Sequence, residues 1–408
     1  MEVDRKKMLD TVKNLHDYAQ FLKSYEGNEH INEWGSHMGG EKFPKPVVCF
    51  NTRITRDTCK KLVDAMGDIN PLYRDGDYTK NTKYGTIIAP PTWPFSIAYG
   101  EYPEFKHPDF NAEYQYDELE WFLPAAEGDN VNFRAVYPCC VEEKDDEILA
   151  CGYYEFLRRQ GGEPMCRQKF SIRYTKKTGD ETKPEPLTVP EYEESYIADV
   201  RKAWDKENED FRGKEIRWFE DVNEGDALTT FVRGPLSVME TAAWVNAASP
   251  YIFCSDKIHR YIHEETGLGH YDTDLNMWLN EHENEYDAYG KLTERTGAAP
   301  AGGFGSQRCG WIITMISNWM SDEGFLWKLK VNHIKHSNEF YNTYWSNAKV
   351  TAKHKDGTSC WVDISFDCVD RYGEKVLCGE ASVMLPSKEL GNVIYPAPET
   401  PFKTICAK

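Results

Sequence analysis

Hydrophobic positions along the first half of the chain follow first a helical and then an alternating pattern. Cys59, Leu62, Val63 and Met66 have helical spacing, and they predict a short helix that starts after Thr55 and stops at Gly67. Farther along, alternating apolar and polar residues predict antiparallel strands over 114–121, 131–137, 148–157 and 165–174. The first half is therefore expected to place helices before a run of strands.

The second half repeats this order. Apolar spacing predicts helices over 238–247 and 307–320, followed by strands over 327–333, 343–354, 360–370 and 375–385. Two short sequences also recur at the same spacing. Glu120-Trp121-Phe122 precedes Glu127-Gly128-Asp129, as Arg217-Trp218-Phe219 precedes Glu224-Gly225-Asp226. The repeated order favours duplication of one structural unit.

The segments outside these two units have patterns of their own. Residues 1–27 have helical spacing and predict one helix, residues 47–50 predict a strand, and residues 191–212 predict a charged helix. The predicted organisation has five parts: an N-terminal helix (1–29), an N-terminal unit with the active site (30–176), a linker and bridging helix (177–212), a degenerate C-terminal unit (213–388) and a tail (389–408).

Composition narrows the classes of function. The chain has 408 residues, of which 40% are hydrophobic, enough for two packed units. Its net charge of −19 disfavours nucleic acid and anionic membranes as partners. No apolar run approaches the roughly 20 residues of a membrane helix, and no apolar segment follows Met1–Lys7 as in a secretory signal. We therefore expect a cytoplasmic protein, whose 12 scattered cysteines stay reduced.

One stretch concentrates chemically useful groups. Asp68 and Asn70 follow the predicted helix end at Gly67, and an apolar run from Gly85 reaches Pro90-Pro91-Thr92. Turn formation alone accounts for Asp, Asn and Pro here. Proline in the first turn of a helix, however, predicts a helix start at Thr92, where free N–H groups can polarise a carbonyl. An acid beside such a helix tip suits proton transfer.

These residues carry a resemblance to a known family. The segments Gly67–Asp75 and Gly85–Thr92 resemble the signature of the MaoC-like, (R)-specific enoyl-CoA hydratase/dehydratase family, and the similarity extends from residue 40 to residue 385. Segments 120–129, 304–311 and 318–326 are similar to its double-hotdog members. The resemblance implies an α+β double-hotdog fold, in which two antiparallel sheets, each wrapped around a central helix, join side by side.

The resemblance also implies a reaction and a set of roles. Water would add to a 2-enoyl-CoA thioester, or leave a 3-hydroxyacyl-CoA, with Asp68 as the general base and acid. Asn70 and Tyr73 would orient the water, although Tyr73 stands where the family has His. The backbone N–H of Thr92 would bind the thioester oxygen. The predicted residues around that oxygen are Gly85, Pro91, Thr92 and Trp93.

Other candidates carry alternatives. Arg158 and Arg159 are candidates for the phosphates of coenzyme A, as is Arg308, but a solvated strand end or a structural ion pair explains them as well. His259 and His263 lie four residues apart without the sequence of a zinc motif, so a solvent-facing pair is favoured. We expect no metal, and no cofactor beyond the coenzyme A of the substrate.

Three functions remain open at this point. The first is a hydro-lyase acting on an acyl-CoA thioester. The second is a hotdog acyl-CoA thioesterase, and the third is a non-catalytic acyl-CoA-binding subunit of a hetero-complex. The second half has Ala247-Ala248-Ser249-Pro250-Tyr251 in place of the acid motif, so only one site is expected. A homodimer is compatible with the sequence, and the acyl group is not specified by it.

Overall fold

The structure is a computed structural model of the whole chain. It describes residues 4–31, 51–98, 105, 107–177, 189–248, 257, 269–273, 276–280, 304–335 and 340–402. The predicted strand at 47–50 and the histidines at 259 and 263 lie outside these ranges.

The first half contains short helices followed by four long strands. Thr55 caps the N-terminus of α3 through its side chain, which accepts a hydrogen bond from the Thr58 N–H, as the sequence predicts. The elements are α1 (Arg5–Thr11), α2 (Leu15–Lys23), β1 (Glu29–Ile31), α3 (Arg56–Met66), η2 (Pro71–Tyr73), α4 (Gly76–Thr79), η3 (Trp93–Ser96), β2 (Phe110–Trp121), β3 (Val131–Glu143), β4 (Glu147–Arg158) and β5 (Pro164–Lys176).

The second half begins with a long helix and again ends in four strands. Its elements are α5 (Glu194–Glu209), η5 (Phe219–Asp221), β6 (Phe231–Arg233), α6 (Val238–Ala248), β7 (Gly269–Asp272), β8 (Met277–Asn280), α9 (Gly305–Met320), β9 (Phe325–His333), β10 (Tyr344–Lys355), β11 (Cys360–Asp370) and β12 (Lys375–Met384). Every predicted strand of this half is present within two residues of its predicted bounds.

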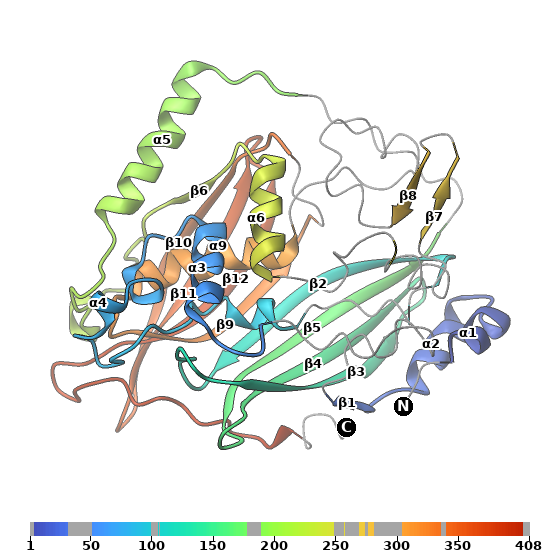
Figure 1. The fold of residues 1–408 in the computed structure, drawn as a ribbon, viewed down its shortest axis with the longest axis horizontal. Helices are drawn as coiled ribbons and strands as arrows, with labels where there is room; N and C mark the ends of the chain where they lie inside the picture. Colours follow the sequence, from blue (N-terminus) through green and yellow to red (C-terminus); the bar gives the residue numbers. More distant parts are fainter. Residues whose placement is uncertain are drawn as a thin grey trace.

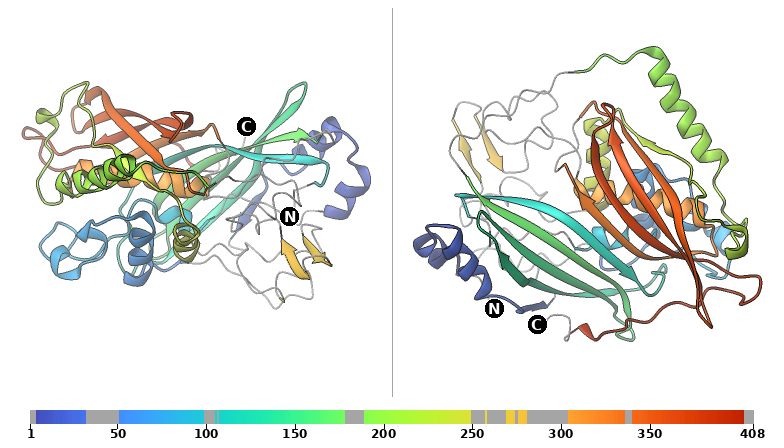
Figure 2. Two further views of the ribbon diagram at one scale, coloured as in Figure 1. Left: turned by 90° about the horizontal axis from the view of Figure 1, so that it is seen from above. Right: turned by 180° about the vertical axis from the view of Figure 1, so that it is seen from behind.

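The two halves share one continuous sheet. Ten strands follow the order β1-β3-β4-β5-β2-β9-β12-β11-β10-β6, and β2 of the first half pairs antiparallel with β9 of the second. Helices α3, α6 and α9 lie together on one face of this sheet (Figures 1 and 2). The predicted α+β double-hotdog fold is confirmed by this arrangement.

Helix α9 fills the core between the halves. Fourteen of its residues, Gln307 to Met320, are buried, and most of them are apolar or small. Gly310 lets the helix approach α3: a Cβ at this position would lie 2.4 Å from the Sδ of Met66. The second half therefore supplies the central helix against which the Asp68 segment (residues 67–73) is placed.

Two helix predictions are wrong. The N-terminal helix is interrupted, because Val12 is extended and Asn14 caps a new helix, α2, through its side chain. The helix expected to begin at Thr92 is only the four-residue 3-10 helix η3. Pro94 lies at its second position, and Gly100 and Pro103 follow within ten residues. These residues disfavour a long helix after Thr92.

Other expectations concern chemistry and boundaries. All nine cysteines within the described ranges are free thiols, as expected. Among the described helices, none combines the length and the apolar content needed to cross a membrane. The domain boundaries after residues 29, 176, 212 and 388 remain predictions.

Candidate active site

The end of α3 gives Asp68 its position. Gly67 adopts a left-handed conformation (φ 64°), and the Asp68 N–H then donates to the Val63 carbonyl at 2.9 Å. This pairing is the usual glycine-terminated end of a helix. Asp68 and Asn70 continue the chain in tight turns, since Asp68 Oδ1 accepts the Asn70 N–H and Asn70 Oδ1 accepts the Leu72 N–H, each at 2.9 Å.

Burial changes the acidity of Asp68. The residue is 3% exposed, and this burial raises the pKa of the carboxyl from 3.8 to about 6. The Asn70 N–H, the Arg233 guanidinium and the Asn318 side chain oppose the rise, whereas the charge of Glu207 adds to it. A buried carboxyl with a pKa near neutrality can both accept and return a proton at physiological pH.

Tyr73 lies in the same buried region, at 1% exposed. Burial, and secondly the nearby charge of Asp68, raise the pKa of this phenol far above its usual value of 10. Ser317 of α9 lies against it and acts in the opposite direction. Tyr73 therefore stays neutral and can donate a hydrogen bond, but it cannot serve as a base.

Two charged residues of the second half hold the end of α3. Arg233 in β6 donates two hydrogen bonds to the Met66 carbonyl, at 3.0 and 2.8 Å, and forms an ion pair with Glu207 of α5 at 2.9 Å. Arg233 is 7% exposed and Glu207 9% exposed. The pair therefore fixes the last carbonyl of the helix directly before Gly67 and Asp68.

The predicted thioester site is only partly formed. Thr92 lies 1% exposed against α9, and its Oγ1 has no hydrogen-bond partner among the described residues. The Pro91 carbonyl accepts a hydrogen bond from Trp121 Nε1 at 3.1 Å. Trp93 is 1% exposed and packs edge-on against Phe156, so it is a core residue. Since η3 is a single turn, the N–H groups of an extended helix are not available here.

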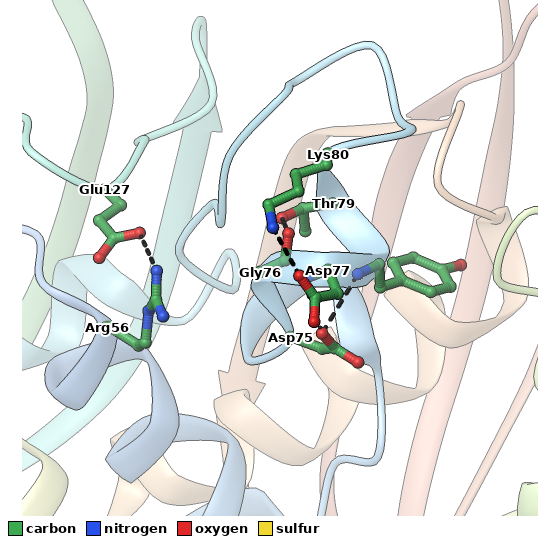
Figure 3. Close-up of polar contacts among 8 residues, drawn as sticks. Arg56, Asp75, Gly76, Asp77, Thr79, Lys80 and Glu127 are labelled. Carbon is green, nitrogen blue, oxygen red and sulfur yellow. Dashed lines mark hydrogen bonds and ion pairs between the residues drawn. The ribbon is translucent and has the colours of Figure 1, made fainter.

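One cavity contacts the Asp68 segment, and a second is lined by Asn318, the α9 residue beside Asp68. The first, of about 630 Å³, lies on the outer side of this segment and includes Pro71, Gly85 and Ile87. Figure 3 shows its charged rim, where Arg56 pairs with Glu127 and Lys80 pairs with Asp77. The cations of this rim are thus neutralised by neighbouring acids.

The second cavity, of about 470 Å³, lies beside the C-terminal end of α9. Its lining includes Asn318, the residue next to Asp68, together with Arg212 and Arg217. Burial, and secondly the charge of Arg212, lower the pKa of Arg217 to about 10. Five acidic residues also line this cavity, namely Glu207, Glu209, Asp210, Glu215 and Asp226, and Arg212 pairs with Glu215 at 3.3 Å.

The three arginines predicted to bind the phosphates of coenzyme A have different surroundings. Arg158 forms ion pairs with Asp129 and Glu163 at 3.2 and 2.9 Å, as in the structural alternative. Arg159 is exposed at the strand end. Arg308 is 1% exposed in the first turn of α9, which keeps it from a phosphate at the surface. These three residues lie on β4, the loop after it and α9, and no cavity described above is lined by them.

Sequence reasoning did not assign roles to Glu207, Arg233, Ser317 or Asn318. Asn318 and Ser317 stand in or beside a segment that carries the family resemblance, so the resemblance offered a signal for them. The sequence offered no signal for Glu207 or Arg233. A charged residue on a polar helix, or at the end of a short strand, is usually exposed to solvent.

A known protein family matches part of the first half of the chain. A family described as "FAS1-like, dehydratase domain region" matches residues 40–148, which contain both the Asp68 segment and Thr92. Among curated proteins, a UPF0336 protein of Thermobifida fusca is 42% identical over 45 residues, and one of Streptomyces avermitilis is 37% identical over 46 residues. These matches span 30% and 31% of the relatives and 11% of this chain.

Solved structures agree with the whole fold. A MaoC-like dehydratase superposes with a TM-score of 0.55 at 13% identity, covering 89% of this chain and 99% of the other. A MaoC domain protein dehydratase of Chloroflexus aurantiacus superposes with a TM-score of 0.53 at 10% identity, covering 89% and 96%. At these identities the likeness concerns the fold. The likeness in fold to MaoC-like dehydratases agrees with the resemblance found in the sequence, and the matching dehydratase family covers residues 40–148.

Proposed function

We propose that this protein, with the fold of the MaoC-like dehydratases, is a hydro-lyase that adds water to a 2-enoyl-CoA thioester or removes it from the 3-hydroxyacyl-CoA. The observation that carries the proposal is the buried Asp68 carboxyl, whose pKa is raised to about 6, beside the neutral phenol of Tyr73. Dehydratase is also the description of the family that matches residues 40–148.

Asp68 is the proton carrier of the proposed reaction. In the hydration direction its carboxylate takes a proton from water as the water oxygen bonds to the β-carbon. The same proton then returns to the α-carbon, so the carboxyl ends in its starting state. A carboxyl with a pKa of about 6 holds and releases this proton at similar cost near pH 7.

Tyr73 orients the water in place of the histidine of the family. Its hydroxyl donates a hydrogen bond and stays protonated, because the neighbouring Asp68 charge disfavours a phenolate. Asn70 is bound to the Leu72 N–H through its Oδ1, which leaves its NH₂ group to donate. Tyr73 and Asn70 would therefore donate hydrogen bonds to the reacting water, and the Asp68 carboxylate would accept its proton.

The proposed substrate path runs through the cavity beside Asn318. Its lining includes Asn318, next to Asp68, and Arg217, which we assign to a phosphate of coenzyme A, whereas Arg212 of the same cavity is paired with Glu215 at 3.3 Å. The Thr92 hydroxyl is a buried donor without a partner among the described residues, and it offers a hydrogen bond to the thioester oxygen. The hydroxyl would take the place of the backbone N–H groups that an extended helix starting at Thr92 would have offered to this oxygen.

A screen of 2-enoyl-CoA substrates tests the proposal. The purified chain is incubated with enoyl-CoAs of different chain length and ring type, and loss of enoyl absorbance is recorded beside release of free thiol. Water addition without thiol release is expected. Thiol release would instead identify a thioesterase on the same fold.

A non-catalytic acyl-CoA-binding subunit is the second candidate. The absence of an extended helix after Thr92 favours it, because the N–H groups that polarise the thioester in the family resemblance are missing from this part of the described chain. Binding of acyl-CoA with no turnover, and turnover only after addition of a partner protein, would support this candidate.

A further inference from the structure

A cluster of three potential metal ligands lies at the seam between the two halves. Asp117 projects from β2, His333 from β9 and Cys309 from α9, so the cluster joins residues separated by up to 216 positions in the chain. The exposed fractions of the side chains of Asp117 and His333 are 0% and 1%, and Cys309 is 0% exposed. The proposed proton transfer at Asp68 uses none of them.

The distances within the cluster fit a tetrahedral ion. His333 Nε2 lies 3.2 Å from Asp117 Oδ2, Cys309 Sγ lies 3.5 Å from the same oxygen, and Cys309 Sγ lies 3.8 Å from His333 Nε2. Zinc bonds of about 2.0–2.3 Å at tetrahedral angles place ligand atoms about 3.3–3.7 Å apart, and the shortest and longest of the three distances each differ from this range by about 0.1 Å. A direct charge-assisted hydrogen bond between His333 and Asp117 would normally be shorter, about 2.7–2.9 Å.

The surroundings orient the carboxylate. Asp117 Oδ1 accepts hydrogen bonds from the Tyr114 hydroxyl at 2.8 Å and from Gln168 Nε2 at 2.7 Å. Its other oxygen, Oδ2, is thereby turned toward His333 and Cys309. Such support from a second layer of hydrogen bonds is typical of carboxylates that bind metals.

Charge also favours a divalent ion. A thiolate from Cys309 and a carboxylate from Asp117 supply two negative charges, and His333 binds as the neutral imidazole. An ion of charge two would balance these two ligands, and the buried guanidinium of Arg308, next to Cys309, is a further positive charge nearby. A ligand set of one sulfur, one nitrogen and one oxygen suits zinc or a chemically similar transition metal.

We propose that Asp117, Cys309 and His333 form a buried site for a divalent transition metal such as zinc, and that the ion links the two halves of the sheet. Nine residues of α9 separate Cys309 from Asn318, the helix residue beside Asp68. This corresponds to about 13 Å along the helix, so the ion is distant from the residue that contacts Asp68. Three protein ligands leave one position for water or a small anion.

Metal analysis of the full-length protein tests the site. The wild-type chain is purified without added metal, and its metal content is measured by mass spectrometry before and after dialysis against zinc. We expect one equivalent of metal in the wild type, near-complete loss in Cys309→Ser and His333→Gln, and full retention in Cys166→Ser, which removes another fully buried cysteine. Equal metal in wild type and Cys309→Ser would identify an adventitious ion and overturn the proposal.

A spectroscopic measurement covers the case in which the variants do not fold. Co²⁺ added to the chelator-treated wild type should give the visible bands of a tetrahedral ion and a thiolate charge-transfer band, with saturation at one equivalent. Removal of the metal should also lower the melting temperature of the wild type by several degrees, because the ion binds only the folded chain. Wild-type protein that holds no metal and gives no such bands would contradict the site.

Discussion

Arg233 in the second half donates two hydrogen bonds, of 3.0 and 2.8 Å, to the carbonyl oxygen of Met66 at the end of α3 in the first half. The carbonyl would otherwise be left without a partner inside its helix. Asp68 follows two residues later, so the position of the proposed base depends on a contact between the halves.

Replacement of Arg233 should reveal the strength of this contact. Arg233→Met leaves Glu207 buried without its partner, and the expected loss in the free energy of unfolding is about 3–5 kcal/mol. The double variant Arg233→Met/Glu207→Met removes both charges and should lose much less. Denaturant unfolding measures the free energy of unfolding of both variants. Equal losses in the single and the double variant would show that an unpaired Glu207 costs no stability.

The pH profile of hydration should report Asp68. Its pKa is raised to about 6 by burial, and the carboxylate is the active form in hydration. We therefore expect kcat/KM to fall about tenfold per pH unit below pH 6 and to level off above it. Glu207→Gln should shift the inflection to lower pH, because the charge of Glu207 raises the Asp68 pKa. An unchanged inflection would show that a group other than Asp68 sets the pH dependence of kcat/KM.

The same carboxyl should make the fold less stable at neutral pH. The Asp68 pKa is about 6 in the folded chain, against 3.8 without burial, so the folded chain holds the proton more tightly than the unfolded chain. The contribution of Asp68 to the free energy of unfolding is therefore most favourable below pH 4 and is lost as the pH rises through 6. Asp68→Asn removes this titration and keeps an oxygen for the Asn70 N–H. We expect a gain of about 2–3 kcal/mol at pH 7.5 that disappears near pH 4. A loss of stability at pH 7.5 would contradict the raised pKa.

The close approach of α9 to α3 can be tested at Gly310. A Cβ there would lie 2.4 Å from Met66 Sδ, so Gly310→Ala should cost about 1–3 kcal/mol in the free energy of unfolding. Combination with Met66→Ala should cost less than the sum of the two single changes, because the same space is involved. Gly357→Ala, at a position with open space around it, is the matched control and should be nearly neutral.

Sequence patterns predicted most of the strands because strands with one buried face tend to alternate apolar and polar residues. The burial pattern of β11, for example, alternates over its whole length. The helix after Thr92 was predicted wrongly because the proline pair was read as a helix start, whereas Pro94 and the glycine and proline beyond it disfavour a helix. Local sequence signals conflicted there.

The site was predictable only in its first half. Asp68, Asn70 and Tyr73 lie in one short segment and therefore have a recognisable signature. Glu207 and Arg233 reach the same place from α5 and β6. The contact of β2 with β9 brings Asp117 to His333. Such contacts depend on how the halves pair, which no local pattern in the sequence encodes.

The central claim is that Asp68 transfers the proton in a hydration reaction. Its most direct test is kcat for water addition to the best enoyl-CoA found in the screen, measured for wild type, Asp68→Asn and the exposed control Asp57→Asn at pH 7.5. We expect a loss of at least about 10²-fold for Asp68→Asn, from removal of the general base, and an unchanged rate for the control. Equal turnover by wild type and a folded Asp68→Asn protein would contradict the account.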